Sequence, residues 1–182
     1  KNNPAQILIA SLFKLHGNAL TRNATSYVMY YKDVLDVLTH PLIEPFVNAN
    51  DLVSRINRNN YTFITHKKIV ELHPNGNELF SLLFQKWDTG SVAVLENISQ
   101  ILLQIKGNLS YENDEEKITN AFVYAIFKVI NKMISYFSEH RKIDDIKTLQ
   151  AIYKQVIDVA EVSFEGEPLN GLQIMGVLES RV

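Results

Sequence analysis

The sequence predicts a mainly α-helical domain of several helices, with a short strand element near its C-terminus. Along most of its 182 residues, apolar residues recur every three or four positions, which is the spacing of one face of an α-helix. Asn, Thr or Asp precedes several of these runs and Gly or Asn follows them, as expected at helix ends. From residue 162 onward the period changes, and short apolar segments lie between Gly- and Pro-containing turns, which is typical of strands.

The first predicted helix begins at the N-terminus of the chain. Asn3 is a suitable N-cap and Pro4 a suitable first helical residue, because Pro has no N–H to leave without a partner there. Leucines then repeat on one face, and Gly17-Asn18 predicts the end of the helix. The polar residues 21–26 fit a loop.

Short helices are expected to follow. One is introduced by residues 30–33, with its inward-facing residues between Val34 and Leu38, and is ended by His40-Pro41, because the residue before a proline is disfavoured in helical conformation. Another is suggested by Leu52, Val53 and Ile56 and ends at Asn59-Asn60.

Residues 61–64 fit either a strand or an extended lead-in, and Thr65 then caps a short helix that runs through Leu72. After a turn over residues 74–76, Asn77 is the expected cap of a further helix that contains three leucines.

The second half predicts longer helices. One has its apolar face over residues 95–105 and is closed by Gly107. Asn113 with Glu116 three residues later is a capping box, and it opens a long helix that runs to Glu139.

The apolar arc of this long helix is wide, which predicts a central helix packed on several neighbours. Its expected inner stripe is Ile118, Phe122, Ala125, Val129, Met133 and Tyr136, broadened by Val123, Phe127, Ile130, Ile134 and Phe137. One more helix is expected after Asp144.

Strand segments are predicted over residues 162–164 and 172–177, separated by turn residues. The whole chain, residues 1–182, is expected to form one domain. Because it begins without Met and stops abruptly at Val182, we expect it to be a piece of a larger protein.

Composition narrows the class of protein. Hydrophobic residues make up 46% of the chain and charged residues 21%, as in an ordinary globular protein. The net charge of −2 predicts no general attraction to nucleic acid or to anionic membranes. The absence of cysteine rules out disulfides and thiolate metal sites and is compatible with a cytoplasmic location. No apolar run is long enough to cross a bilayer, so no membrane partner is expected.

No pattern of catalytic residues is complete. Acid pairs such as Asp33/Asp36 and Asp144/Asp145 could in principle bind a metal, but they fall at predicted helix starts, where acids favour the positive end of the helix dipole. The five histidines are scattered, and without cysteine a zinc site would need ligands from several loops. Phosphate-binding glycine motifs and serine-nucleophile motifs are missing. We therefore predict no catalytic residue, metal, cofactor or small-molecule substrate.

The densest cationic group of the chain is the best candidate for contact with DNA. Cations neutralise phosphates, and the aromatic residues Tyr61 and Phe63 between them could stack on bases. An ordinary solvated surface over two buried aromatics would look the same in sequence. The candidate residues are Arg55, Arg58, Lys67 and Lys68.

Two strings of the sequence resemble a known family. Residues 169–181, LNGLQIMGVLESR, are similar to the segment before the final helicase-like block in the B subunit of AddAB (RexAB)-type helicase–nucleases. The resemblance is to the Bacteroidetes-type members described as PD-(D/E)XK nuclease family proteins. Residues 30–43, which begin YYKDVL, also resemble that group. The resemblance implies that residues 162–182 lead back to the helicase-like core of a parent protein. It also implies that the nuclease acids of that protein lie beyond Val182.

The same resemblance implies a degenerate helicase motif. In active superfamily 1 helicases a strand enters the pattern T-x-H-x-x-K-G-L-E-F, and Gln173 fits the approach to it. Gly176 stands in place of the Thr, Leu178 in place of the His and Arg181 in place of the Lys. The resemblance thus implies a non-catalytic, 2B-like helical accessory domain that contacts DNA or a partner subunit in double-strand-break processing. The alternatives are a protein-interaction domain without DNA contact and a stand-alone enzyme.

Overall fold

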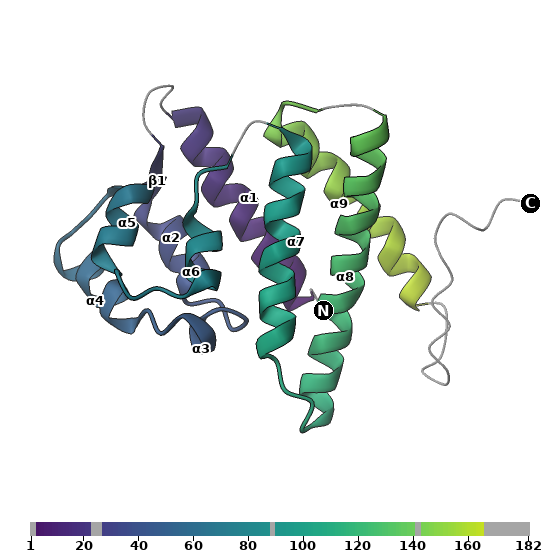
Figure 1. The fold of residues 1–182 in the computed structure, drawn as a ribbon, viewed down its shortest axis with the longest axis horizontal. Helices are drawn as coiled ribbons and strands as arrows, with labels where there is room; N and C mark the ends of the chain where they lie inside the picture. The colour runs from purple at the N-terminus through teal and green to yellow at the C-terminus, as the bar shows by residue number, and fades with distance from the viewer. Residues whose placement is uncertain (1–2, 23–26, 88–89, 141–142, 166–182) are drawn as a thin grey trace, which may run out of the picture.

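The computed structural model describes residues 3–22, 27–87, 90–140 and 143–165, and in these residues the chain is mainly α-helical, as the sequence predicts. Figure 1 shows long helices gathered at one side of the molecule and short helices at the other. The first helix runs between the two groups.

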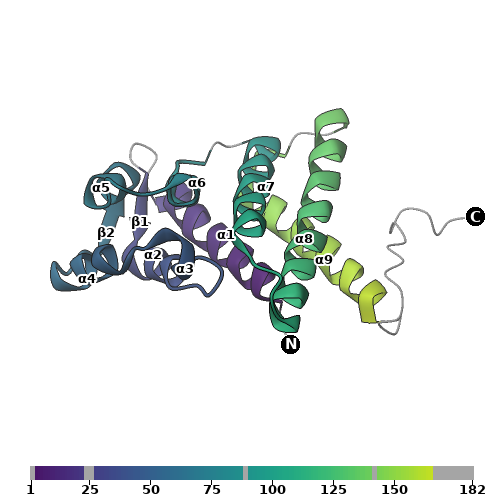
Figure 2. The same ribbon diagram turned by 60° about the horizontal axis from the view of Figure 1, so that its bottom comes forward.

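Four long helices form the larger part of the molecule. They are α1 (Pro4–Arg22), α7 (Ser91–Asn108), α8 (Asp114–Glu139) and α9 (Ile146–Glu165). Helices α7 and α8 form the most extensive pair, and α1 contacts both α8 and α9. The view in Figure 2 shows the same arrangement, with α8 and α9 at the end far from the short helices.

Residues 27–87 form a group of short elements that we call the short-helix lobe. In order along the chain they are β1 (Val28–Tyr30), α2 (Tyr31–Leu38), α3 (Glu44–Val47), α4 (Asn50–Arg58), β2 (Phe63–Thr65), α5 (His66–Leu72) and α6 (Glu78–Phe84). The two strands pair antiparallel into a small ribbon, with Met29 opposite Ile64. Helix α1 packs on β1 and α2, and α6 packs on α7, so the lobe is joined to the long helices.

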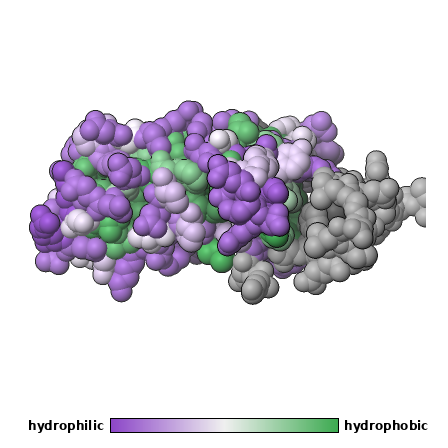
Figure 3. All heavy atoms as spheres, turned by 90° about the horizontal axis from the view of Figure 1, so that it is seen from below, coloured by the Kyte–Doolittle hydropathy of each residue, from purple (hydrophilic) through white to green (hydrophobic). Residues whose placement is uncertain are grey.

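One hydrophobic core runs through both groups. Its largest fully buried side chains include Trp87, which meets the ring of Phe13 edge-on at 5.5 Å between ring centroids. Trp87 lies after α6 and Phe13 lies in α1, so this contact fixes the lobe against the bundle. Seen from below, the surface is mostly hydrophilic, with apolar residues showing between the polar ones in several places (Figure 3).

The predicted helix caps are confirmed where they can be checked. The side-chain oxygen of Asn3 accepts from the backbone N–H of Ala5, and that of Thr65 accepts from Lys68 N–H. Asn77 and Asn113 cap α6 and α8 in the same way, with N–H···O distances of 2.9 and 2.8 Å. Each bond satisfies an N–H that the first helical turn leaves without a partner.

Two predicted boundaries are wrong. Helix α1 continues through Gly17-Asn18 to Arg22, because a single glycine costs only about 1 kcal/mol and buried Ala19 extends the core face. Helix α9 continues to Glu165, so residues 162–164 are helical rather than a strand. A helix that has formed gains one backbone bond per added residue, which outweighs the weak strand preference of Val and Phe. The predicted strand over residues 172–177 lies outside the described residues.

Helix α8 has the predicted bounds, but the prediction of its inner face is wrong. The buried residues are Asn120, Val123, Ile126, Ile130, Met133 and Phe137. Of the predicted inner stripe, Ile118, Phe122 and Tyr136 are 55%, 43% and 57% exposed, and Ala125 and Val129 are half-buried. Helix α8 does contact three other helices, yet a second apolar stripe on it faces solvent.

Candidate nucleic-acid interface

The structure places the four predicted cations in the short-helix lobe. Arg55 and Arg58 lie in the last turn of α4, and Lys67 and Lys68 lie in α5. The chain between these helices includes β2, so the four residues border the ribbon along the sequence.

Two of these cations are already paired with acids. Arg55 forms an ion pair with Asp51 at 2.7 Å, and Lys68 forms one with Glu71 at 3.3 Å. Both pairs are exposed, so they add little stability, but each acid partly neutralises its cation towards an incoming anion. No ion pair of Arg58 or Lys67 occurs within the part of the chain that the structure describes.

Two further cations belong to this region, although the sequence did not single them out. Lys32, in the first turn of α2, has its Nζ 6.0 Å from the ring centroid of Tyr31. Lys86 lies close enough to His66 for its charge to act on the ring. Burial lowers the pKa of His66, and the positive charges of Lys67 and Lys86 lower it further. The sequence places Lys32 directly after two tyrosines, a mixture of aromatic and cationic residues that suits nucleic-acid contact. Only the pairing of β1 with β2 shows that Lys32 lies in the same region as the cations of α4 and α5.

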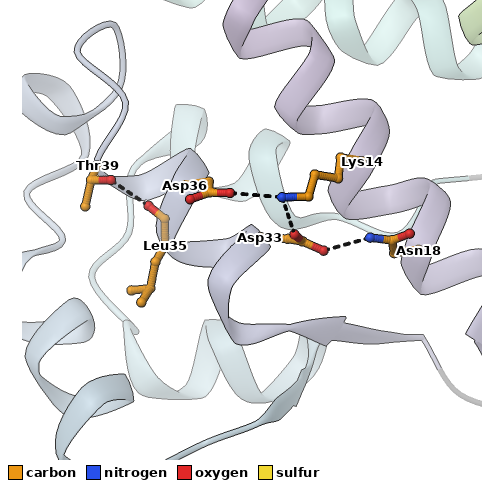
Figure 4. A network of polar contacts seen from close by, with 6 residues as sticks. All are labelled: Lys14, Asn18, Asp33, Leu35, Asp36 and Thr39. Atoms are coloured by element: carbon orange, nitrogen blue, oxygen red, sulfur yellow. Dashed lines mark hydrogen bonds and ion pairs between the residues drawn. The ribbon is translucent and has the colours of Figure 1, made fainter.

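The acid pair Asp33/Asp36 of α2 is joined to α1 by ion pairs with Lys14 (Figure 4). Lys14 of α1 reaches the Asp33 carboxylate at 3.0 Å and the Asp36 carboxylate at 3.2 Å. The Asn18 side chain donates a hydrogen bond to Asp33 at 2.9 Å. Hydrogen bonds to Asp33 and Asp36 raise the pKa of Lys14. Because the Asp33 side chain is only 1% exposed, its charge is matched inside the protein and serves the packing of α1 on α2.

Of the other acids expected at helix starts, Asp145 caps its helix, as predicted. The Asp145 carboxylate accepts from the Thr148 backbone N–H at 2.9 Å at the start of α9. Glu116 accepts from the Ser110 hydroxyl and the Glu112 N–H, and these bonds, led by that from Ser110, lower its pKa. The Asn113 backbone N–H lowers the pKa of Glu116 as well.

A buried polar cluster lies where α1, the ribbon and α6 meet. His16 is fully buried and stacks on Trp87 at 4.2 Å between ring centroids. Its Nε2 donates to the Leu83 carbonyl at 2.9 Å, and its Nδ1 accepts from the Tyr27 hydroxyl. Burial lowers the pKa of His16 to about 3, so the ring is neutral at physiological pH. With no access to solvent, this imidazole organises packing and cannot serve as a general base for an outside substrate.

The described residues hold no group of three or more His, Cys, Asp or Glu side chains placed to bind a metal ion. An open depression between α6, α7 and α8 is lined largely by amide and hydroxyl side chains, with Glu96 as its only ionisable lining residue. None of the described helices is both long and apolar enough to span a bilayer. The residues of the degenerate helicase-like string, Gln173, Gly176, Leu178 and Arg181, lie outside the described residues.

Comparison of the chain with models of known protein families, with curated proteins and with solved structures found no match. The resemblance of residues 169–181 and 30–43 to AddAB-type helicase–nucleases therefore stays a prediction from the sequence.

Proposed function

We propose that this chain is a non-catalytic helical accessory domain of a cytoplasmic, helicase-like DNA-repair nuclease. In this role it contacts DNA, or the partner subunit of the helicase–nuclease, during the processing of double-strand breaks. Residues 169–181 and 30–43 support the family, because they resemble the corresponding segments of its B subunit. No cofactor, metal or small-molecule substrate is part of the proposal.

One observation supports the DNA contact above the others. The cations Lys32, Arg58, Lys67 and Lys86 take part in no ion pair among the described residues, whereas most acids of the lobe are held by cations. Asp33 and Asp36 pair with Lys14, Asp51 with Arg55, and Glu71 with Lys68. The six Lys/Arg and six Asp/Glu of the lobe balance, but these four cations carry no acid partner of their own among the described residues. Such charge attracts the phosphate backbone without reading sequence.

The test is a salt titration of duplex affinity with the Arg58→Ala, Lys67→Ala double variant. Each lost phosphate contact lowers the slope of log K against log salt by about 0.9 for duplex DNA, so we expect the slope to fall by about two units. A matched control is Lys132→Ala with Lys154→Ala, which removes the same charge from exposed positions on α8 and α9. Equal slopes for wild type and the double variant, or equal effects of both double variants, would mean that the lobe is only a solvated surface.

A second candidate function, subunit docking without DNA contact, is favoured by the exposed stripe of α8. Ile118, Phe122 and Tyr136 lie on one side of the helix at spacings of four and fourteen residues. From first to last the stripe extends about 27 Å along the helix. Exposed apolar stripes of this kind mark sites where another helix or protein packs. Absence of duplex binding even at low salt would make this second function the better one.

A further inference from the structure

The outer seam between α7 and α8 carries two lysines that converge on one tyrosine ring. The Nζ atom of Lys106 in α7 lies 5.4 Å from the ring centroid of Tyr124, and that of Lys128 in α8 lies 5.6 Å from it. Both distances are within the range of a cation–π contact. The two lysines are half-buried, and Tyr124 is 41% exposed. Two positive charges therefore share one ring at the protein surface.

These two charges are not matched by acids of the chain. Neither Lys106 nor Lys128 forms an ion pair among the described residues, whereas Lys117 on the same helix pairs with Asp114 at 3.2 Å. Two like charges beside one ring repel each other, and cation–π contacts at an exposed site offset this repulsion only in part. An anion between the two ammonium groups would stabilise both of them.

The same seam leads into the polar depression between α6, α7 and α8. Asn131 of α8 donates a hydrogen bond to the Ser99 hydroxyl of α7 at 3.1 Å, and both residues line the depression. Lys106 follows Ser99 by seven residues, and Tyr124 precedes Asn131 by seven. Because α7 and α8 run antiparallel and lie side by side (Figure 1), these two turns bring the lysines to the same side of the pair, about 10 Å from the depression.

Apolar side chains lie between the lysines and the depression. Leu103 of α7 and Phe127 of α8 occupy the turns between the two pairs of contacts, and Leu103 is 47% exposed. Phe127 is half-buried, and its ring stacks on that of Tyr124 at 6.3 Å between centroids. The surface thus has a positive end, an apolar middle and a depression lined by amides and hydroxyls. We call Leu103, Lys106, Tyr124, Phe127 and Lys128 the seam site.

We propose that the seam site binds an acidic peptide segment of a partner protein. A carboxylate of the peptide lies between Lys106 and Lys128, and a neighbouring apolar side chain packs on Leu103. The peptide backbone continues towards the depression, where side-chain amides and hydroxyls can pair with its N–H and C=O groups.

Nucleic acid and small anions fit this surface less well. A strand of nucleic acid carries a phosphate on every nucleotide and needs cations along its whole path. Among the described residues that line the depression, Glu96 alone is ionisable, and its carboxylate repels phosphates. A small anion would stay largely in water, because the depression is open and binding sites for small molecules enclose most of their ligand. The proposal goes beyond the proposed DNA contact, since the seam site shares no residue with the cations of the short-helix lobe.

The test begins with a phage-displayed library of random peptides of about twelve residues, a length that spans the seam even as a helix. Selection on the intact chain should return peptides in which Asp or Glu stands beside an apolar residue. A fluorescent copy of the strongest binder is then titrated with the protein. Lys106→Gln with Lys128→Gln should weaken it roughly 5- to 30-fold, as expected for two partly exposed ion pairs, and should reduce its salt dependence. Leu103→Ser should weaken binding without changing the salt dependence.

The matched control is Lys132→Gln with Lys154→Gln, which removes the same charge from exposed positions on α8 and α9 and should leave peptide binding unchanged. Acetylation of lysines in the wild-type chain gives a measurement that needs no variant. The bound peptide should slow the acetylation of Lys106 and Lys128 but not that of Lys132. Melting curves identify any variant that has lost its fold, and for such a variant the acetylation result decides.

Three results would overturn the proposal. The first is a selection that returns no acidic peptides, or acidic peptides that bind the Lys106→Gln, Lys128→Gln variant as tightly as the wild type. The second is displacement of the peptide by oligothymidine with the same dependence on the two lysines, which would make the seam a nucleic-acid contact. The third is self-association of the wild type in sedimentation that the double variant lacks, which would make a second copy the occupant. None of them bears on the titration of the Arg58→Ala, Lys67→Ala variant, so the proposed DNA contact is tested separately.

Discussion

The buried ring of His16 predicts that acid weakens the fold well before the carboxylates titrate. His16 is fully buried, with Leu83 carbonyl as acceptor on one nitrogen and the Tyr27 hydroxyl as donor on the other. Protonation would place a second N–H against the Tyr27 hydroxyl and a charge inside the core. Burial therefore lowers the pKa of His16 to about 3, against an ordinary value of 6.5.

The sign and size of the effect follow from proton linkage. Between pH 6.5 and about 3 the unfolded chain binds a proton at His16 that the folded chain does not bind. The stabilisation from the neutral ring is thus fully present above pH 6.5 and is lost as the pH falls towards 3, by up to about 1.4 kcal/mol per pH unit. At about pH 5 the free energy of unfolding should be lower by about 2 kcal/mol than at about pH 7 from this residue alone.

Urea unfolding at these two pH values measures the loss. Trp87 is the only tryptophan and stacks on His16, so its fluorescence reports the state of this region. His16→Gln keeps an amide donor and acceptor but cannot titrate, and its pH dependence should be smaller by about 2 kcal/mol. Burial also lowers the pKa values of His40 and His66, and these contributions cancel between wild type and variant. Equal pH dependence in the two proteins, or an NMR titration of the His16 ring near its ordinary pKa, would refute the reasoning.

Three further substitutions test the packing. Ile130→Asp places an unpaired charge in the hydrophobic core and should cost about 4 kcal/mol or more. Phe122→Asp at an exposed position should cost less than about 1 kcal/mol in the same urea titration, and similar costs would mean that the assigned inner face of α8 is wrong. Among the described residues, Lys14→Met leaves the buried Asp33 carboxylate with the Asn18 hydrogen bond alone. Because Lys14 itself is half exposed, we expect a loss of about 1–3 kcal/mol, which an unchanged urea midpoint would contradict.

Helix existence and caps were predictable because their causes are local. Asn113 bonds the N–H three residues later whatever surrounds it, and the predicted span of α8 agrees with the structure. Thr65 and Asn77 were recognisable for the same reason. The predicted end of α1 at Gly17 was wrong because the packing of the next turn on a distant element can outweigh a local stop signal. Here that packing includes the hydrogen bond from Asn18 to Asp33 of α2.

The rotation of α8 was not predictable from its own sequence. Apolar residues occupy two stripes, one through Val123 and Ile130 and the other through Phe122 and Val129, and each satisfies helical spacing. Which stripe turns inward depends on the surface that α7 and α1 offer, and Asn120 in the inner stripe adds a polar residue that spacing alone would exclude. The ribbon was missed in part for a related reason. A strand of three residues has too few positions to show alternation, and only pairing with residues far along the chain defines it.

The two candidate contact surfaces lie at different ends of the molecule, and this bears on how the proposed functions relate. Both ribbon views place β1 and the short-helix lobe at one end of the long axis and α8 towards the other. A partner packed on the stripe of Ile118 and Phe122 would therefore leave the cations of the short-helix lobe open to DNA. Coupling between the two surfaces would pass through α1, which contacts both β1 and α8 and carries the Lys14 and His16 contacts to the lobe, or through α7, which contacts both α6 and α8. The proposed DNA contact and the proposed subunit docking are thus compatible in one chain, and each would affect the other only through these two helices.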